Sequence, residues 1–135
     1  MKEVHGCRTI LVVEDNDTIS ETLKDLLELE GYHVILAKNG REALTAIDNA
    51  LRPCLILLDM FMPIMDGWEF LDQLKLKEGD LITSLPIVVT SAAGERAEEA
   101  SKLVRGFIKK PVDLNVLLKT VETFCNCSAA SRSAR

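Results

Sequence analysis

Histidine is scarce, with two residues in a chain of 135. Two are too few for a metal site with three histidine ligands. No apolar stretch approaches the roughly 18 residues that a membrane-spanning helix requires, and the first six residues contain no apolar signal region. Positive charge is also in deficit, and a net charge of −5 repels phosphate backbones. We therefore expect a cytoplasmic protein that makes no contact with a membrane and does not bind nucleic acid directly.

The spacing of the four cysteines excludes a zinc ribbon; they are Cys7, Cys54, Cys125 and Cys127. Cys54 lies in an apolar segment and is expected in the core. The close pair Cys125 and Cys127 lies near the end of the chain, where we expect a small apolar residue or a free thiol rather than a metal or redox site. A chain of this length buries about two-thirds of the surface that its unfolded form exposes, so it needs no disulfide or metal to fold.

Short apolar segments alternate with segments of helical spacing. The apolar segments are rich in Ile, Val and Leu, which favours strands covered on both faces; they are Thr9–Val13, His33–Ala37, Leu55–Leu58, Leu85–Val89 and Phe107–Ile108. Apolar stripes with helical spacing lie between and after them, formed by Ile19, Leu23, Leu26 and Leu27; by Ala43, Leu44 and Ile47; by Trp68, Leu71 and Leu74; and by Leu114, Leu117, Leu118 and Val121. A further segment, Glu95–Val104, is compatible with a helix, although its apolar content is mostly alanine.

This alternation predicts an α/β fold, a doubly wound five-stranded parallel sheet with five helices and right-handed crossovers. Five strands are too few for an eight-stranded barrel. We expect one domain over residues 8–124, with an N-terminal extension at 1–7. Residues 125–135 are then a disordered tail or the stub of a linker, because they are rich in Ser, Ala and Arg and lack periodicity. In such a sheet the functional site lies beyond the carboxyl ends of the strands.

Polar residues of distinct chemistry stand at these strand ends. Glu14 and Asp15 follow the first strand, Asp59 ends the third, Thr90 the fourth and Lys110 the fifth. Three converging carboxylates repel one another unless a cation neutralises them, and Mg²⁺ binds one or two carboxylates together with waters and a phosphate oxygen. A metal, an ammonium and a hydroxyl together suit a phosphoryl group in transfer, with the central Asp59 as its acceptor.

The sequence resembles the response-regulator receiver domain, the phosphoacceptor module of two-component signalling. The resemblance covers about residues 8–124, and it is carried by Ile10-Leu11-Val12-Val13-Glu14-Asp15-Asn16, Leu57-Leu58-Asp59-Met60-Phe61-Met62-Pro63, Met65-Asp66-Gly67, Val88-Val89-Thr90-Ser91 and Phe107-Ile108-Lys109-Lys110-Pro111. It implies the flavodoxin-like receiver fold.

The resemblance implies a metal and phosphorylation site. Asp59 would take a phosphoryl group from a phosphohistidine on a sensor histidine kinase or a histidine phosphotransfer protein. Glu14, Asp15 and Asp59 would hold Mg²⁺ together with the backbone carbonyl of Phe61. Lys110 would pair first with Asp59 and then with the phosphoryl group. Such a protein is a signalling module, not a turnover enzyme, and it catalyses only its own phosphorylation and dephosphorylation.

The resemblance also implies a switch. Thr90 would hydrogen-bond the phosphoryl oxygen, and Phe107, the family's switch aromatic, would rotate inward as Thr90 moves. The surface read by a downstream target protein would then be the fourth helix, about Glu95–Val104, with the fifth strand and the fifth helix. The Lys110-Pro111 bond is often cis in this family.

Two positions close to the predicted phosphorylation site carry apolar residues, where polar residues could orient a water molecule. Phe61, two residues after Asp59, and Ala92, two after Thr90, border the path of an attacking water and cannot orient it. We therefore expect slow self-dephosphorylation relative to receivers with polar groups at these positions, since Phe61 could cover the acyl phosphate. The other interpretation is that Phe61 packs aside against Trp68 or Met62 and gates nothing. Glu14 stands where the family more often has Asp, which keeps the charge and lengthens the reach.

Three other functions compete with the receiver. A flavodoxin-like cofactor binder would need a phosphate-binding loop after the first strand, where Glu14-Asp15-Asn16-Asp17 would repel phosphate. A phosphatase with an aspartyl nucleophile would need an acid at the position of Phe61. A degenerate receiver acting as a protein-docking scaffold remains the alternative, although the intact acceptor set speaks against it. Whether the chain is a stand-alone regulator or the isolated receiver of a larger protein stays open.

Overall fold

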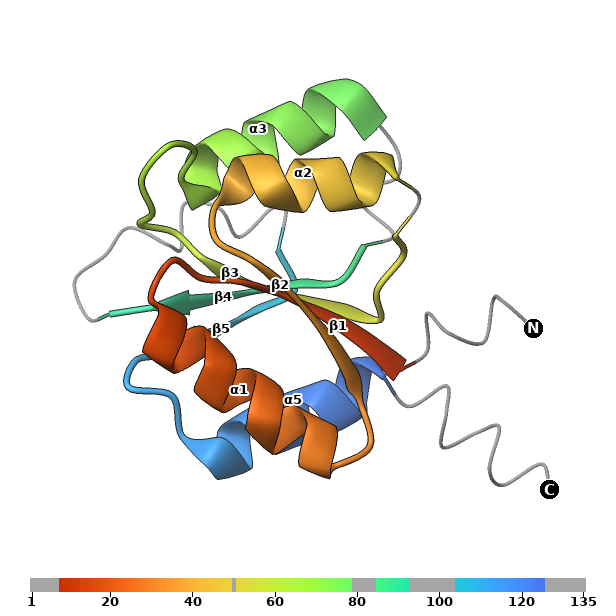
Figure 1. Cartoon of the computed structure of the whole chain (residues 1–135), viewed down its shortest axis with the longest axis vertical. Helices are drawn as coiled ribbons and strands as arrows, with labels where there is room; N and C mark the ends of the chain where they lie inside the picture. Colours follow the sequence, from red (N-terminus) through yellow and green to blue (C-terminus); the bar gives the residue numbers. More distant parts are fainter. Residues whose placement is uncertain (1–7, 50, 79–84, 93–103, 126–135) are drawn as a thin grey trace, which may run out of the picture.

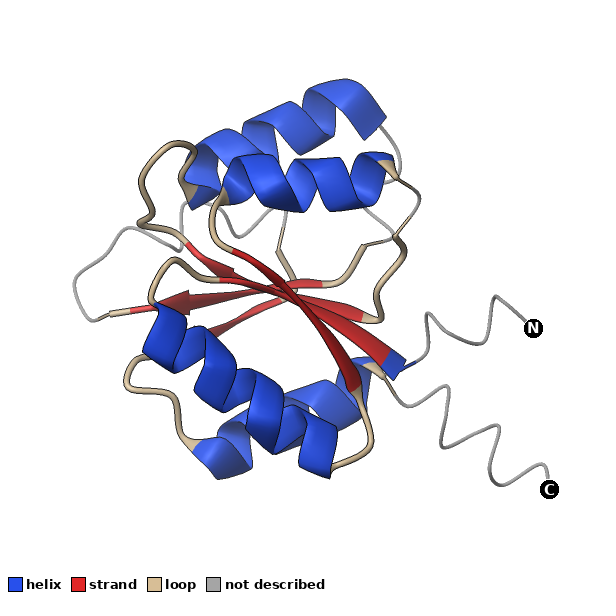
Figure 2. Ribbon diagram, in the orientation of Figure 1, coloured by secondary structure: helices blue, strands red, loops and turns tan. Residues whose placement is uncertain are grey.

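The computed structural model describes residues 8–49, 51–78, 85–92 and 104–125, and it contains one five-stranded parallel sheet (Figures 1 and 2). The strands are β1 (Thr9–Val13), β2 (His33–Ala37), β3 (Leu55–Asp59), β4 (Ile87–Ser91) and β5 (Gly106–Lys109). Their order in the sheet is β2-β1-β3-β4-β5, so the chain leaves β1 toward one edge and then returns past it to the other. This is the doubly wound parallel sheet that the alternation of segments predicts.

Four helices flank the sheet in the described part of the chain: α1 (Asp17–Leu29), α2 (Gly40–Asp48), α3 (Gly67–Glu78) and α5 (Leu114–Phe124). Asn16, Asn39 and Asp113 cap the first, second and fourth of these, since their side-chain oxygens accept backbone N–H groups of the first turn. Gly31, with φ +96°, follows the C-cap residue Glu30 of α1 and takes the left-handed conformation that favours glycine there. The predicted fourth helix lies outside the described residues except for Val104. None of the described helices is long and apolar enough to span a membrane.

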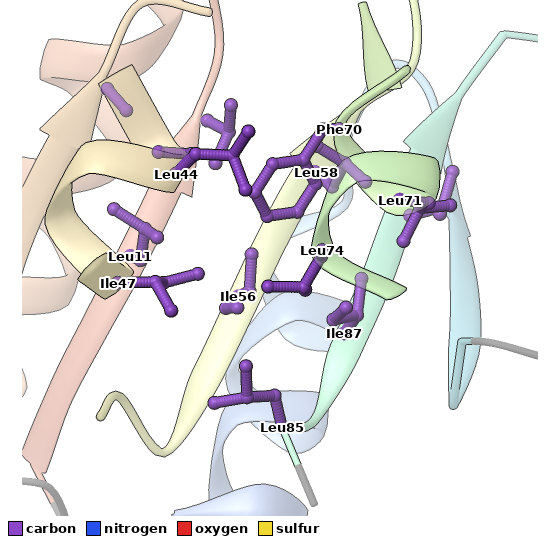
Figure 3. Packing of buried hydrophobic residues seen from close by; sticks show 14 of the residues in the cluster. Leu11, Leu44, Ile47, Ile56, Leu58, Phe70, Leu71, Leu74, Leu85 and Ile87 are labelled. Carbon is purple, nitrogen blue, oxygen red and sulfur yellow. The ribbon is translucent and has the colours of Figure 1, made fainter. Parts of the chain in front are cut away.

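The core lies in two layers, one on each face of the sheet. Helices α2 and α3 cover one face, and α1 and α5 cover the other (Figure 1). Figure 3 shows Leu44 of α2 and Phe70 of α3 gathered near Leu58 of β3. Along β3, Ile56 and Leu58 belong to this layer, while Leu55 and Leu57 belong to the opposite one. Burial on both faces explains why the strand sequences do not alternate between apolar and polar residues.

Two details of the predicted elements are wrong. The fourth strand begins at Ile87 instead of Leu85, because Pro86 has no N–H to donate, although Leu85 is buried and the carbonyl of Pro86 accepts the N–H of Ile56. Leu114 is 41% exposed although it belongs to the apolar stripe of α5. It lies in the first turn of that helix and lines an open apolar groove against α1 instead of the core.

The expectation of a free thiol at the end of the chain is wrong for Cys125. Its sulfur forms a disulfide with Cys54, and the two Cα atoms lie 5.2 Å apart. Cys54 is buried in the core as predicted. The physical reason is topological, because β3 begins at the same edge of the sheet at which α5 ends, so residues 71 positions apart come together. Cys7 and Cys127 lie outside the described residues.

Gly67 allows α3 to begin directly against the strand that carries Asp59. A Cβ at this position would lie 2.8 Å from the Cα of Met60 and 3.0 Å from the carbonyl oxygen of Asp59. Both are backbone atoms, so neither can rotate away. The N–H of Gly67 also donates to the carbonyl of Met60 at 3.0 Å. The motif Met65-Asp66-Gly67 therefore has a packing reason that its sequence does not reveal.

We predict that Gly67→Ala destabilises the protein by about 2 kcal/mol, because overpacking against backbone forces the start of α3 away from Asp59. Urea unfolding would measure the change. Gly106→Ala is the matched control, since among the described residues a Cβ there would meet only the Cγ2 of Val88, at 3.9 Å. Equal midpoints for the two variants would contradict this explanation of Gly67.

Candidate functional site

The topology brings three strand ends together at one edge of the sheet. β1 is followed by Glu14 and Asp15, and β3, which pairs directly with β1, ends in Asp59. The strand order reverses between these two strands, which is where ligands bind in doubly wound sheets. Thr90 of β4 is the register partner of Asp59. The predicted site residues therefore lie at the topological switch point.

Glu14, Asp15 and Asp59 form a compact carboxylate cluster. Each offers an oxygen that lies within 4.8 Å of those of the other two. Glu14 and Asp59 are each 5% exposed, whereas Asp15 faces solvent. Two charged groups buried this deeply at such short range are costly unless other groups compensate for them.

Lys110 bridges the two buried carboxylates. Its Nζ lies 3.3 Å from Oε1 of Glu14 and 3.3 Å from Oδ1 of Asp59. The backbone holds this lysine in place, because its N–H donates to the carbonyl of Ser91 at 2.8 Å. The Lys110-Pro111 bond is cis. The fifth strand end thus supplies one positive charge to a cluster that carries three negative charges when ionised.

The titration behaviour reflects this imbalance. Burial, and then the Asp59 carboxylate, raise the pKa of Glu14 above its ordinary value, although Lys110 and the N–H of Asn16 act in the opposite direction. Burial alone would lower the pKa of Lys110, but the Asp59 and Glu14 carboxylates outweigh it and raise that pKa. Lys110 therefore keeps its charge at neutral pH, while the buried Glu14 is not fully compensated.

The two oxygens of Asp59 have different surroundings. Oδ1 accepts the N–H of Phe61 at 3.4 Å and contacts Lys110. Within the described ranges, Oδ2 accepts no hydrogen bond from the protein. One oxygen is thus held by the lysine and the following loop, and the other is available to a ligand.

The donor set fits a hard divalent cation. With Glu14, Asp15 and Asp59 ionised and Lys110 protonated, the cluster carries a net charge of −2, which one Mg²⁺ would neutralise. All ligand atoms are carboxylate oxygens, the type that Mg²⁺ prefers, and the exposed Asp15 leaves a side open for waters or a phosphate oxygen.

The remaining predicted residues lie at different distances from this cluster. Thr90 is buried, 5% exposed, and stands beside Asp59 in the sheet. Phe107 of β5 pairs with Val89 of β4 and is 43% exposed. It is not part of the carboxylate cluster. Phe61 is 54% exposed and Ala92 is exposed. Phe61 is therefore a surface residue, and whether it covers the acyl phosphate or packs aside against Trp68 or Met62 stays a prediction.

Sequence reasoning did not identify Asn16 as part of the site. Its backbone N–H donates to Oε2 of Glu14 at 3.2 Å, and its side chain caps α1 by accepting the N–H of Ile19 at 3.0 Å. The start of α1 thus orients the carboxylate of Glu14. The capping preference of asparagine was the signal that could have placed it there.

Ile64 was missed as well, and it has φ +73°, a conformation rare for a β-branched residue. The N–H of Met65 donates to the carbonyl of Pro63 at 2.8 Å across it, which closes a tight γ-turn after Asp59. The loop between Asp59 and α3 is therefore held in a strained shape beside the acceptor, as is common at functional sites.

Comparison with known proteins agrees with this geometry. Residues 10–122 match the family model described as response regulator receiver domain. The polar-differentiation response regulator DivK of Brucella anthropi is 29% identical over 120 residues, which cover 87% of this chain and 95% of that protein. Response regulator MprA of Mycolicibacterium vanbaalenii is 39% identical over 112 residues, which cover 81% of this chain and 46% of that regulator, so the chain spans about half of its length.

A solved structure gives the same result. The signal receiver domain of a signal transduction histidine kinase from Syntrophus aciditrophicus superposes with a TM-score of 0.74 at 35% identity, covering 87% of this chain and 89% of that one. With the switch-point site, the family match and this superposition in agreement, the chain belongs to the response regulator receiver domain family.

Proposed function

We propose that this protein is a phosphoacceptor in a two-component system or phosphorelay, and that Asp59 receives the phosphoryl group from a phosphohistidine. The observation that supports this most strongly is the arrangement of Asp59, which has one oxygen fixed by Lys110 and the other without a protein partner among the described residues. The donor is a sensor histidine kinase or a histidine phosphotransfer protein, and the protein works in the cytoplasm.

The transfer is a direct displacement at phosphorus. The available carboxylate oxygen of Asp59 forms the new P–O bond, and the P–N bond to the donor imidazole breaks with its electron pair returning to the ring nitrogen. Lys110, already 3.3 Å from Asp59 and Glu14, is placed to follow the phosphoryl oxygens and to offset their charge. Catalysis therefore consists of positioning and charge stabilisation rather than acid–base chemistry.

Mg²⁺, when bound, supplies positive charge to the phosphoryl oxygens. Glu14, Asp15 and Asp59 would hold it with the backbone carbonyl of Phe61. The buried Glu14 is held at both oxygens, because Oε2 accepts the N–H of Asn16 and Oε1 contacts Lys110. The raised pKa of Glu14 supports this role, because a buried charge that the protein alone does not compensate favours an added cation.

Thr90 and Phe107 form the switch in this proposal. The added phosphoryl group introduces charge and strong acceptors next to Thr90, the register partner of Asp59. Thr90 turns toward the phosphoryl group, and the ring of Phe107, half-exposed on the neighbouring strand, fills the space that it leaves. A downstream target protein reads the resulting face of the fourth helix, β5 and α5. The protein modifies only itself and turns over no other substrate.

Incubation with Mg²⁺ and acetyl phosphate is predicted to add a single phosphoryl group to the wild-type protein, and Asp59→Asn is predicted to abolish it, because the amide is not a nucleophile. Intact mass spectrometry measures the adduct. Asp72→Asn, on the exposed side of α3, is the control and should be modified like the wild type. An unmodified wild type that still binds Mg²⁺ would favour the protein-docking scaffold instead.

Glu14→Gln is predicted to change metal affinity and folding stability in opposite directions: Mg²⁺ should bind more weakly, and the metal-free protein should be more stable. Because the pKa of Glu14 is raised in the folded state, folding binds protons there, and stability without metal falls as pH rises through its titration range. At neutral pH in EDTA the variant should therefore be more stable, by on the order of 1 kcal/mol, the usual scale of a single substitution.

Calorimetric titration of the same variant should show Mg²⁺ affinity reduced at least about tenfold, as is typical when a group of a metal site is lost. Glu21→Gln, exposed on α1, is the matched control for both measurements. A Glu14→Gln protein that is less stable in EDTA, or that binds Mg²⁺ like the wild type, contradicts the assigned role.

Phe61→Asn is predicted to shorten the lifetime of the phosphorylated protein. The wild-type ring stands two residues after Asp59 and is more than half exposed, so it is available to shield the acyl phosphate from water. A polar amide in its place can orient the attacking water, and we expect about tenfold faster decay, equivalent to about 1.4 kcal/mol of barrier. Leu76→Asn, exposed on α3, is the control. Slower or unchanged decay in Phe61→Asn would show that Phe61 does not gate hydrolysis.

A further inference from the structure

The disulfide between Cys54 and Cys125 lies at the edge of the sheet opposite to Asp59. Cys54 immediately precedes β3, and Asp59 ends that strand, so five residues of extended chain, about 16 Å, separate the two. Cys125 is the C-cap residue of α5, and its N–H donates to the carbonyl of Val121 at 2.8 Å. The bond therefore joins the end of α5 to the start of the strand that carries the phosphoacceptor.

One face of α5 packs against the sheet. Leu117 and Val121 are buried there, and Leu118 and Phe124 are partly buried against the same layer, while Leu114 and Val116 are more than 40% exposed. Cys125 is 1% exposed and Cys54 8% exposed, and both belong to the apolar layer beneath α1 and α5. The disulfide thus adds a covalent anchor at the last turn of a helix whose other contacts with the sheet are non-covalent.

The surroundings of Cys54 suit both oxidation states. Its Sγ lies 3.3 Å from the carbonyl oxygen of Thr9, and its backbone N–H donates to the same oxygen at 2.8 Å. A thiol can donate a hydrogen bond to that carbonyl, whereas a disulfide sulfur has no proton to donate. Reduction would therefore leave the Cys54 thiol with a hydrogen-bond acceptor within reach and the Thr9 carbonyl still satisfied.

We propose that Cys54 and Cys125 form a reversible redox cross-link, in which oxidation fixes the C-terminal turn of α5 to β3 and reduction releases it. The chemistry at Asp59 is unaffected, because the two sites lie at opposite edges of the sheet. This redox cross-link is separate from the phosphoacceptor function. It rests on that function in one respect, because α5 belongs to the surface that we expect a target protein to bind.

The oxidant is a low-molecular-weight disulfide such as glutathione disulfide. One cysteine thiolate attacks it and releases one glutathione, and the second thiolate displaces the other glutathione from the mixed disulfide. The protein loses two electrons and two protons, and the oxidant gains them as two thiols. A dithiol reductant of the thioredoxin class reverses the reaction by the same exchange.

The first experiment tests the bond itself on the full chain. The protein is equilibrated with glutathione disulfide or with reduced glutathione, quenched in acid, alkylated in denaturant and digested with trypsin. We expect Cys54 and Cys125 to resist alkylation only after the oxidising treatment. Because Cys125 and Cys127 fall on one tryptic peptide, the Cys127→Ser variant makes the assignment. Alkylation of Cys54 after the oxidising treatment, or linkage of Cys54 only through Cys127, overturns the proposal.

The second experiment tests the anchor by hydrogen exchange. On reduction, amides in the last turn of α5 should exchange at least about tenfold faster, while those of α2, on the opposite face, should change less than about twofold. The melting temperature should fall by roughly 10 °C, the scale of losing a cross-link across a long loop in a domain of this size. Cys54→Ser should resemble the reduced wild type in both states. Equal exchange of α5 in oxidised and reduced wild type, which requires no variant, overturns the proposal.

A third measurement separates this proposal from the phosphoacceptor function. The initial rate of adduct formation from acetyl phosphate should agree within about twofold between the oxidised and the reduced protein, a difference below about 0.5 kcal/mol in barrier. A difference above tenfold between the oxidised and the reduced protein would show that the disulfide affects the chemistry at Asp59. Absence of the adduct in both states would contradict the phosphoacceptor function, while the exchange data would still decide the cross-link.

Discussion

The repulsion between carboxylates at one edge of the sheet is the constraint on which the site depends. Glu14 and Asp59 are buried within a few ångströms of each other, and Lys110 is the cation that lies between them. The fold tolerates this cost because β1 and β3 are held by a core on both faces. A site with an unbalanced charge of −2 favours a divalent cation and, with it, a phosphoryl group, so the same imbalance that is unfavourable to folding creates the proposed function.

The two edges of the sheet have separate tasks in this account. The proposed phosphorylation would occur where β1, β3 and β4 end, and the cross-link lies where β3 begins. Helix α5 connects them, since its N-cap Asp113 follows Lys110 closely and its C-cap is Cys125. A signal at Asp59 and a redox change at Cys54 would therefore act on the two ends of one helix, through groups that do not touch each other.

Much of the fold and of the site could be predicted from the sequence. Buried parallel strands and amphipathic helices leave clear patterns, and the residues at strand ends must meet once the strands are parallel, which is why Glu14, Asp15, Asp59 and Lys110 were placed together correctly. The pairing of Cys54 with Cys125 could not be predicted, because disulfide connectivity depends on contacts between elements far apart in sequence. The support of Glu14 by Asn16 and the γ-turn at Ile64 depend on loop geometry, which periodicity does not report. Phe107 is exposed on β5, the last strand in the sheet order. The inward rotation of its ring on phosphorylation stays a prediction.

Amide chemical shifts of the full chain, recorded with Mg²⁺ alone and then with Mg²⁺ and beryllofluoride as a stable analogue of the phosphoryl group, test the central claim most directly. The account predicts that Mg²⁺ shifts residues around Glu14 and Asp59, and that the analogue, only in the presence of Mg²⁺, adds shifts at Thr90 and along β5. Shifts that are absent from this edge, or an analogue that binds equally well without Mg²⁺, would contradict it.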